Sequence, residues 1–287
     1  MSAATVALPS TPTPTFAISH LLRRLLAPVA AVVALAAACP AAVVTATVPY
    51  SEGDAKLQGF VAYDDATVNT KKPGILVCPE WWGLNDYAKS RAKQLAALGY
   101  VAFAVDIYGD GQTTKDFGEA GKLATIYKTD RLLTRKRAEA GLAALKAQPG
   151  VDPDRIAAIG YCFGGMVALE MVRAGDPLTG IVVFHGALAP GNDKDGKPMT
   201  LTKTSTKILV QQGADDPFVK APEVAGFLDE FRSAGADFQL IQYSGAVHAF
   251  TNPDNGTDNS KGIAYNAVAD RRSWVAMQTF FGEIFPK

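Results

Sequence analysis

Cysteine is scarce in this sequence, whose 287 residues include only three, at positions 39, 78 and 162. So few cysteines exclude a fold that depends on a framework of disulfide bonds. Cys78 lies within the apolar run GILVCP, which predicts a buried core thiol. We expect the chain to keep one of its other thiols for chemistry.

An excess of charge of either sign is also missing. The 28 basic and 28 acidic residues give a formal net charge of zero, and no long run of one sign occurs. The basic patches of a nucleic-acid-binding protein are therefore absent, and we expect no nucleic-acid partner. Internal repeats are absent too. The length and the 48% hydrophobic content suit one large domain with a sizeable core, or two small ones.

Acidic residues are missing from the first 45 residues. Arg23 and Arg24 precede an apolar stretch at 25–44 that is rich in Ala and Val. A basic start, an apolar middle and small residues at the end are typical of a secretory signal peptide. Cleavage after Ala38 or Ala42 fits the preference for small residues at such sites.

Two alternatives remain open for this segment. About 20 apolar residues can span a bilayer, so the segment could be an uncleaved anchor. Cys39 follows three alanines, as in a lipoprotein cleavage site. We predict a signal peptide or N-terminal anchor at 1–45 and a folded domain at 46–287. The protein is then exported, periplasmic or secreted, and meets a membrane only if the segment stays uncleaved.

After the N-terminal segment, short apolar runs alternate with longer helical patterns. Strands are expected at 57–64, 74–80, 101–108, 155–161, 180–186, 206–213 and 237–245. Helices are expected at 85–100, 131–148, 163–175, 219–235 and 264–285, with a loop and a short helix over 109–130. We expect the basic face of 131–148 to be solvated. The alternation predicts an α/β fold with a mostly parallel central sheet and helices on both faces.

The stretch GYCFG at 160–164 has the form G-x-C-x-G, the thiol counterpart of the G-x-S-x-G nucleophile elbow. It lies where an expected strand ends and a helix begins, so Cys162 occupies a tight turn that small flanking residues allow. At a helix N-terminus, free N–H groups and the helix dipole favour a thiolate and a developing oxyanion. The pattern predicts that Cys162 is a nucleophile.

An acid and then a histidine follow the nucleophile in such folds, each on a loop after a later strand. Asp215 and Asp216 follow the strand at 206–213, and His248 follows the next strand. His185 also ends a strand, and it either lines the site or is packed and hydrogen-bonded. The order predicts a Cys-His-Asp triad in which the histidine transfers the proton and the acid orients it.

Five motifs occur in one order along the chain: PEWWGLND, VDIYG, GYCFGGMVAL, GADDPFV and YSGAVHAF. Together they resemble the dienelactone hydrolase family of α/β-hydrolases over residues 47–285. The resemblance implies the α/β-hydrolase fold and a carboxylic ester hydrolase that cleaves an ester or lactone, such as carboxymethylenebutenolide (dienelactone). It implies no metal and no organic cofactor.

The resemblance also assigns the catalytic residues. The family nucleophile falls on Cys162 and the family histidine on His248. The family acid comes three residues after a glycine, here Gly213, which selects Asp216 and leaves Asp215 to cap the turn.

A fourth catalytic residue and the oxyanion hole come from the same resemblance. Glu80 in CPEWWG matches a family glutamate that contacts the resting thiol and helps to take its proton when substrate arrives. The backbone N–H groups of Trp81 and Phe163 would form the oxyanion hole. We expect these groups to face a substrate pocket lined by Trp82, Tyr108, Tyr127 and Asn252.

The chain departs from the family at the arginines that hold the carboxylate of the lactone. Asn252 and Leu123 stand where the family has these arginines. Lys122 or Lys128 is left as a substitute, although a lysine cannot grip a carboxylate in the bidentate manner of an arginine. The hydrolase machinery is therefore better supported than the dienelactone substrate.

Three alternatives to a lactonase stay open. The nearest is a general carboxylesterase or thioesterase that acts on neutral substrates. The second is a non-catalytic binding protein with the hydrolase fold, and the third is a redox-sensing thiol at Cys162. For partners, we expect only a small-molecule ester or lactone, and we expect a monomer. The loop NPDNGTDN at 252–259 is rich in oxygen ligands but lacks the EF-hand order, so we predict a polar surface loop.

Overall fold

The structure is a computed structural model that describes residues 42–67, 70–193 and 195–286. Predictions that concern residues 1–41 lie outside the described residues. The compact unit that contains every described residue spans Pro40–Lys287. Its first strand begins at Val43, so the last three residues of the predicted signal segment, 43–45, pair within the sheet. Cleavage after Ala38 or Ala42 would leave this strand intact.

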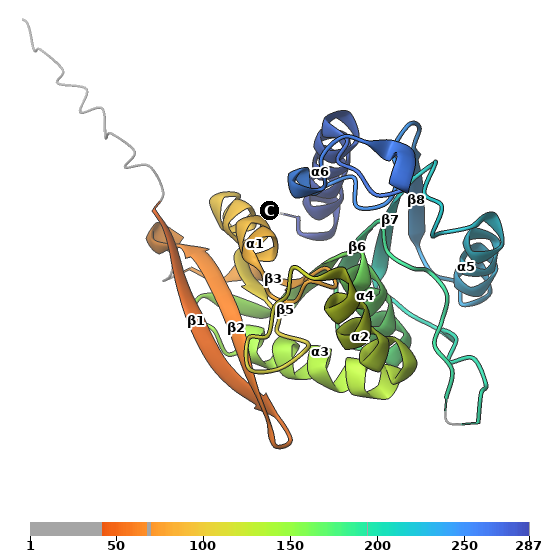
Figure 1. Ribbon diagram of the computed structural model, residues 1–287. Coiled ribbons are helices and arrows are strands. Elements are labelled where there is room, and N and C mark those ends of the chain that lie inside the picture. The colour runs from red at the N-terminus through yellow and green to blue at the C-terminus, as the bar shows by residue number, and fades with distance from the viewer. Residues whose placement is uncertain (1–41, 68–69, 194, 287) are drawn as a thin grey trace, which may run out of the picture. The chain divides into compact units, whose positions relative to one another are not determined.

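Eight strands form one sheet in the order β1-β2-β4-β3-β5-β6-β7-β8 (Figure 1). The strands are β1 (Val43–Glu52), β2 (Ala55–Asp64), β3 (Lys72–Cys78), β4 (Val101–Ala104), β5 (Val151–Tyr161), β6 (Gly180–Phe184), β7 (Lys207–Gly213) and β8 (Phe238–Tyr243). The hairpin β1–β2 is antiparallel and joins β4 in antiparallel register. All remaining pairs are parallel, so the predicted mostly parallel sheet is confirmed.

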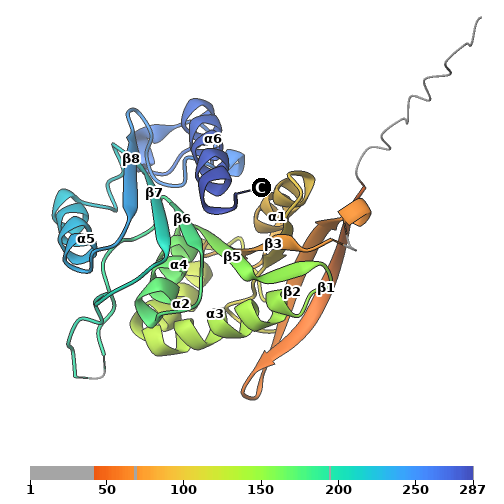
Figure 2. The ribbon, with the colours of Figure 1, turned by 180° about the vertical axis from the view of Figure 1, so that it is seen from behind.

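Six α-helices cover the two faces of the sheet. They are α1 (Asp86–Ala97), α2 (Phe117–Thr129), α3 (Arg131–Lys146), α4 (Phe163–Ala174), α5 (Ala221–Ser233) and α6 (Ala267–Ile284). Figures 1 and 2 show α1 and α6 on one side of the sheet, with α3 and α4 on the other. Buried side chains of α2 and α5 join the same core layer as those of α3 and α4.

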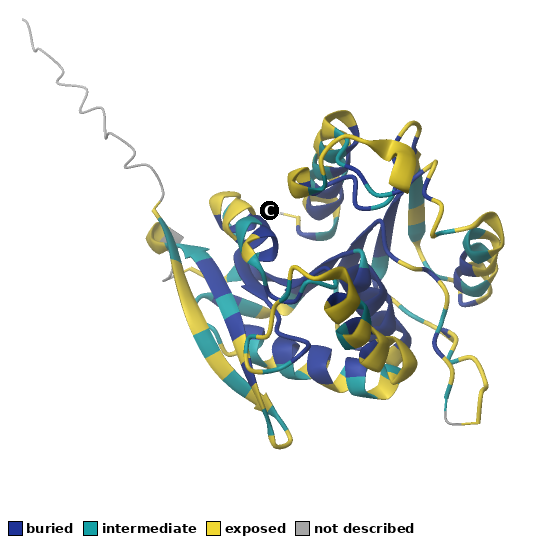
Figure 3. Cartoon of the chain, in the orientation of Figure 1, coloured by how far each residue is buried: buried dark blue, intermediate teal, exposed yellow. Residues whose placement is uncertain are grey.

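Each central strand contributes side chains alternately to the two core layers. In β3, Ile75 and Val77 point towards α1 and α6, whereas Leu76 and Cys78 point towards α3 and α4. Successive side chains of a strand lie on opposite faces, so a strand that is buried on both sides must be apolar throughout. Figure 3 shows these central strands as buried. Cys78 is fully buried, as predicted, and burial raises the pKa of its thiol to about 12.

Two connections differ from the prediction. The strand expected at 101–108 ends at Ala104, because the Asp106 carboxylate turns the chain by accepting the backbone N–H groups of Gly109 and Gly111. The short helix expected in 109–130 is the 13-residue α2, which Asp116 caps by accepting a hydrogen bond from the backbone of Glu119.

The basic face of α3 is not simply solvated, so that prediction was wrong. Glu170 of α4 is fully buried against α3 and needs counter-charges. Arg135 of α3 binds it at 2.8 Å, and Arg173 binds it from α4 itself. Arg137 of α3 is also buried, with only 9% of its surface exposed.

No helix among the described residues is both long enough and apolar enough to cross a membrane.

Candidate active site

Cys162 lies in the turn between β5 and α4, at the carboxyl edge of the sheet. Its backbone has a φ of +53° and a ψ of −114°, a conformation that costs energy in a residue with a side chain. The neighbouring glycines make the turn possible. A Cβ atom on Gly164 would lie 2.1 Å from the carbonyl oxygen of Cys78, and one on Gly160 would lie 2.0 Å from that of Gly164. The predicted elbow is thus present in the backbone.

Three side chains from separate loops form a hydrogen-bonded chain at this edge. The Sγ atom of Cys162 lies 3.1 Å from Nε2 of His248, and Nδ1 of His248 lies 2.8 Å from Oδ2 of Asp216. Asp216 follows β7, and its other carboxylate oxygen accepts the backbone N–H of Phe218. His248 follows β8. The structure therefore brings together the three residues that the sequence nominated as a triad.

The surroundings of His248 favour its charged form. Burial by itself disfavours the imidazolium, but the Cys162 sulfur and the Asp216 carboxylate outweigh burial and raise the pKa of His248 to about 10. A protonated His248 is a hydrogen-bond donor at both ring nitrogens. It can then donate to the sulfur and to the carboxylate at the same time.

Asp215 has a separate role from its neighbour. Its carboxylate accepts the backbone N–H of Gly245, in the turn that follows β8. Asp215 thus ties together the two loops that carry Asp216 and His248. It caps the turn of the histidine loop rather than its own.

His185 is fully buried beneath the elbow, which agrees with the packed and hydrogen-bonded alternative. Its Nδ1 accepts the backbone N–H of Cys162 at 3.1 Å. Burial holds the pKa of His185 well below its usual value, so the ring is neutral and carries its proton on Nε2. That N–H donates to the hydroxyl of Thr251 at 2.7 Å.

A buried polar network continues from Thr251 to helix α6. The Thr251 hydroxyl lies 2.6 Å from the hydroxyl of Tyr87, which also accepts a hydrogen bond from Arg91. Arg91 donates to the Thr251 carbonyl and forms a 2.7 Å ion pair with Asp270. The network therefore connects the Cys162 elbow to the loop that carries His248. No pattern in the sequence predicts it, because Tyr87 and Arg91 look like ordinary positions of an amphipathic helix.

Glu80 lies at the end of β3 and is only 2% exposed. Burial raises the pKa of its carboxyl to about 7, against the effect of a 2.8 Å hydrogen bond from the amide of Asn252. The family resemblance implies a contact between this glutamate and the resting thiol. In the structure the thiol is hydrogen-bonded to His248 and Glu80 to Asn252, and no hydrogen bond joins Glu80 to the thiol among the described residues. Both residues line the same cavity.

Of the two residues expected in the oxyanion hole, Trp81 lines the same cavity as Cys162, and Phe163 follows Cys162 as the first residue of α4. The backbone N–H groups of Trp81 and Phe163 have no hydrogen-bond partner among the described residues. The hydroxyl of Tyr108 donates to the Trp81 carbonyl at 2.9 Å and so fixes that loop. Unused backbone donors beside a nucleophile can bind the oxygen of a tetrahedral intermediate.

A cavity of about 200 Å³ opens onto the thiol. Its lining consists mainly of apolar side chains and includes one lysine: Glu80, Trp81, Trp82, Phe117, Lys128, Cys162, Phe218, His248, Ala249, Asn255 and Ile263. Lys128 is thus the better placed of the two lysines considered from the sequence. Tyr108 and Tyr127 do not line the cavity, because both are buried in the core and Tyr127 donates to the Tyr108 carbonyl. That part of the prediction was wrong.

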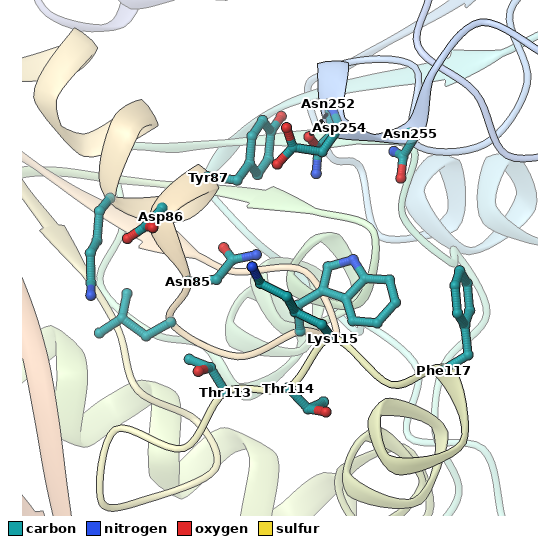
Figure 4. Close-up of a pocket in the computed structure, with 13 residues that line it drawn as sticks. Asn85, Asp86, Tyr87, Thr113, Thr114, Lys115, Phe117, Asn252, Asp254 and Asn255 are labelled. Carbon is teal, nitrogen blue, oxygen red and sulfur yellow. Dashed lines mark hydrogen bonds between the residues drawn. The ribbon is translucent and has the colours of Figure 1, made fainter.

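A second and larger cavity of about 550 Å³ adjoins the first (Figure 4). It is lined by Trp82, Leu84, Asn85, Asp86, Tyr87, Lys89, Thr113, Thr114, Lys115, Phe117, Asn252, Asp254 and Asn255. The predicted pocket residues Trp82 and Asn252 both belong to this lining. Within the described part of the chain, no group of three or more His, Cys, Asp or Glu side chains is arranged to hold a metal ion.

The fold and the site together define an α/β-hydrolase: a mostly parallel sheet with a nucleophile elbow after β5, an acid after β7 and a histidine after β8. The dienelactone hydrolase family model matches residues 57–285. The chain therefore belongs to the dienelactone hydrolase family and is a hydrolase of that family.

Solved structures and curated relatives agree with this assignment. A dienelactone hydrolase-like promiscuous phosphotriesterase, P91 from metagenomic libraries, is 42% identical with a TM-score of 0.78, covering 85% of this chain and 99% of that one. The structure named m3DLH is 37% identical with a TM-score of 0.77 over the same shares. A Bradyrhizobium protein named "Probable 2-oxo-3-(5-oxofuran-2-ylidene)propanoate lactonase" is 29% identical over 72% of this chain and 82% of its own length.

Proposed function

We propose that this protein hydrolyses a carboxylic ester or lactone through a cysteinyl acyl-enzyme. Cys162 is the nucleophile, His248 transfers the proton and Asp216 orients His248. The observation that carries the proposal is the continuous hydrogen-bonded chain from sulfur to imidazole to carboxylate, with distances of 3.1 Å and 2.8 Å.

In the first half-reaction, the Cys162 thiolate attacks the carbonyl carbon and a C–S bond forms. The carbonyl oxygen becomes an oxyanion, and the N–H groups of Trp81 and Phe163 stabilise it. When the intermediate collapses, the C–O bond to the alcohol breaks and the imidazolium of His248 gives its proton to the leaving oxygen. The products are a thioester on Cys162, a neutral His248 and an alcohol, which is released from an ester but stays part of the acyl group of a lactone.

The second half-reaction needs neutral His248, and acylation itself supplies it. Once the sulfur is a thioester it carries no negative charge, so one of the groups that raise the pKa of His248 is lost. His248 then accepts a proton from water as the water oxygen attacks the thioester carbon. The C–S bond breaks, the acid leaves, and the thiolate–imidazolium pair is restored.

The substrate is the less constrained part of the proposal. A dienelactone carries a carboxylate, and Lys128 is the cation that lines the cavity at the thiol. The rest of this lining is mainly apolar and suits a neutral ester instead. We propose lactone hydrolysis of the carboxymethylenebutenolidase type with Lys128 as the carboxylate partner, and general carboxylesterase or thioesterase activity as the alternative.

Steady-state hydrolysis of dienelactone and of 4-nitrophenyl acetate tests both levels of this proposal. Cys162→Ala is expected to abolish turnover of either substrate. Lys128→Met is expected to lower kcat/KM for dienelactone by about 10- to 100-fold, because a charge-assisted contact is worth roughly 1.5–3 kcal/mol, and to spare the neutral ester. If Lys128→Met has equal effects on both substrates, Lys128 does not bind the substrate carboxylate. If Cys162→Ala is active, the proposed mechanism is wrong.

A second candidate activity is the hydrolysis of phosphate triesters. It is favoured by the 42% identity to a protein that is named as a promiscuous phosphotriesterase. Paraoxon turnover by the wild type that disappears in Cys162→Ala would support it. Turnover no faster than in buffer would exclude it.

Reactivity of Cys162 in the same proteins distinguishes the proposed hydrolysis from two non-hydrolytic roles. A binding protein with the hydrolase fold would leave Cys162 unreactive towards iodoacetamide at neutral pH. A redox sensor would form a sulfenic acid at Cys162 and turn over no ester.

We also propose that the protein is exported, and that it is a monomer with residues 1–45 as a signal peptide or anchor. N-terminal sequencing of the protein secreted by a bacterial host checks the first statement. A first residue of Cys39 or Val43 is expected, and an intact N-terminus would favour an anchor.

A further inference from the structure

The two cavities at the carboxyl edge of the sheet adjoin each other. Trp82, Phe117 and Asn255 line both of them. Asn252, which lines the larger cavity, donates a hydrogen bond to Glu80 of the smaller one. The cavity at the thiol, about 200 Å³, lies below the range of roughly 300–1,000 Å³ that is usual for small-molecule sites, whereas the larger one, about 550 Å³, lies within it. A substrate that reaches Cys162 therefore has room for a second, larger part.

The larger cavity has a lining of different chemistry from the cavity at the thiol. It combines three aromatic side chains, Trp82, Tyr87 and Phe117, with a set of neutral amides and hydroxyls: Asn85, Thr113, Thr114, Asn252 and Asn255 (Figure 4). Its charged side chains are two lysines and two aspartates, Lys89, Lys115, Asp86 and Asp254. Because these charges cancel, the lining favours neither an anion nor a cation.

Several polar groups of this lining are available to a ligand. The side-chain oxygen of Asn85 caps α1 by accepting the backbone N–H of Ala88, whereas its amide nitrogen has no partner among the described residues. The hydroxyl of Thr113 is likewise without a partner within the described part of the chain. Amides and hydroxyls both donate and accept, as do the hydroxyl groups of a polyol.

The chain also indicates which part of an ester would occupy this cavity. The leaving alcohol must lie beside His248, which donates its proton to that oxygen. Asn252, Asp254 and Asn255 are on the loop that follows His248, and all three line the larger cavity. The alcohol therefore extends from His248 towards these residues.

We propose that the larger cavity binds the alcohol portion of the substrate ester, and that this portion is a neutral hydroxylated ring such as a sugar. Trp82 and Phe117 offer apolar surface to the C–H side of the ring, and the Asn85 amide and the Thr113 hydroxyl pair with its hydroxyl groups. This inference rests on the proposed ester hydrolysis, because it takes His248 as the proton donor to the leaving group.

A matched pair of acetates tests the inference on the full chain. Methyl 6-O-acetyl-α-D-glucopyranoside and cyclohexylmethyl acetate present the same primary ester on a hydroxylated and an apolar ring. We expect kcat/KM to favour the glucoside by at least about tenfold, because a site with unpaired polar groups rejects an analogue that lacks hydroxyls. Equal values, or a preference for the apolar ring, would overturn the inference.

Two variants locate the preference in this cavity. Asn85→Ser keeps a helix cap but removes the amide donor, and Thr113→Val removes a hydroxyl without changing the shape of the side chain. Each is expected to reduce the preference for the glucoside by about 3- to 10-fold, which corresponds to one hydrogen bond. Thr279→Val on the exposed side of α6 is the matched control, and its preference should equal that of the wild type. No change in either cavity variant would place the selectivity elsewhere.

Binding of the product alcohol separates this inference from the proposed reaction. Saturation-transfer NMR with methyl α-D-glucopyranoside and the Cys162→Ala variant is expected to show contact, and adding Asn85→Ser should weaken it. Binding of the glucoside without any ester turnover would refute the proposed hydrolysis but not the alcohol-binding site. Ester turnover with neither binding nor preference for the glucoside would refute the alcohol-binding site but not the hydrolysis.

Discussion

At the residue scale, the chemistry of the site depends on how a few buried polar groups are paired. Cys162 and His248 are paired with each other, and Glu80 is paired with Asn252. His185 is neutral and holds the Cys162 backbone through its Nδ1. Each pairing fixes which group carries a proton, and therefore which group can give or take one.

Glu80→Gln is expected to stabilise the fold above neutral pH. Burial raises the pKa of Glu80 to about 7, so between its unfolded value and pH 7 the native state binds the proton more tightly than the unfolded state. Stability is then lost as the pH rises through this window. Glutamine has no carboxyl group to ionise, so the variant does not lose this stability. At about pH 8 its free energy of unfolding should exceed that of the wild type by an amount on the order of 3 kcal/mol.

Urea unfolding at about pH 5 and about pH 8 measures this effect. The exposed Glu283→Gln is the control, and its stability difference from the wild type should not change with pH. A Glu80→Gln variant that is less stable than the wild type at the higher pH would show that the carboxylate is favourable where it lies. Activity is expected to fall in this variant even as stability rises, which is common where a site is strained or charged.

Thr251→Val is expected to destabilise the protein and slow catalysis together. It leaves the Nε2–H of buried His185 and the hydroxyl of Tyr87 without their partner, at a cost of about 1–3 kcal/mol. Because His185 holds the elbow, the alkylation rate of Cys162 by iodoacetamide should fall as well. Thr279→Val is the control on an exposed helix face. A thiol that alkylates at the wild-type rate in Thr251→Val would show that the network does not position it.

The sequence alone located the triad because each of its members has a local signature. Cys162 lies in a glycine-flanked turn, and Asp216 and His248 follow apolar strands in the expected order. The network beneath them has no such signature. Arg91 and Thr251 are 160 residues apart, and only the packing of α1 against the histidine loop brings them together.

At the element scale, the strand–turn–helix unit of β5 and α4 carries the site. Its close packing leaves no room for side chains at two glycines, and the backbone N–H of Gly165 closes the turn on the Cys162 carbonyl. The same unit is bonded to the neighbouring strand, because the Cys162 N–H also reaches the Phe184 carbonyl. The conformation of the elbow therefore depends on the packing of β3, β5, β6 and α4.

Gly164→Ala is expected to destabilise the protein, although alanine is the better helix former. Its Cβ atom would meet the Cys78 carbonyl oxygen at 2.1 Å, and a backbone atom cannot move aside cheaply. Overpacking of this kind costs about 1–3 kcal/mol. The comparison is Gly226→Ala on α5, where a Cβ atom meets nothing within 4 Å.

Thermal unfolding distinguishes the two glycine variants. Gly226→Ala should gain about 0.5–1 kcal/mol from helix propensity and the reduced entropy of the unfolded chain, so its Tm rises while that of Gly164→Ala falls. Equal shifts in the two variants would contradict the packing seen at the elbow.

The boundaries of helices and strands were predicted well where the apolar periodicity is regular. They were predicted poorly where side-chain hydrogen bonds end an element. The strands β3, β5, β6, β7 and β8 lie within one to four residues of the predicted ranges. In contrast, β4 ends four residues before its predicted end, because the Asp106 carboxylate turns the chain. The periodicity of apolar residues does not predict such a turn. The ion pair of Arg135 on α3 was missed because its partner, Glu170, lies on another element, α4.

At the scale of the whole molecule, the antiparallel hairpin β1–β2 extends the parallel sheet at the edge opposite β8. It is also linked to the core behind the site. Tyr50 of β1 shares hydrogen bonds with the backbone of Asp106, at 3.0 Å. The hairpin therefore supports the turn that follows β4.

Two truncations test this boundary. Removal of residues 1–39 leaves β1 complete, so the unfolding transition should match that of the full chain. Removal of residues 1–52 deletes β1 and exposes β2 as a new edge, and we expect a loss of at least about 2 kcal/mol. Equal stability of the two shortened proteins would show that β1 contributes nothing to the fold.

The central claim is that the reaction passes through a thioester on Cys162. Acid quenching of the wild type in the first turnovers of 4-nitrophenyl acetate, followed by peptide mass spectrometry, tests it most directly. We expect one acetyl group on the peptide that contains Cys162, released by hydroxylamine and absent in Cys162→Ala. Ester turnover with the acetyl group on another residue, or with no covalent intermediate in the burst phase, would contradict it.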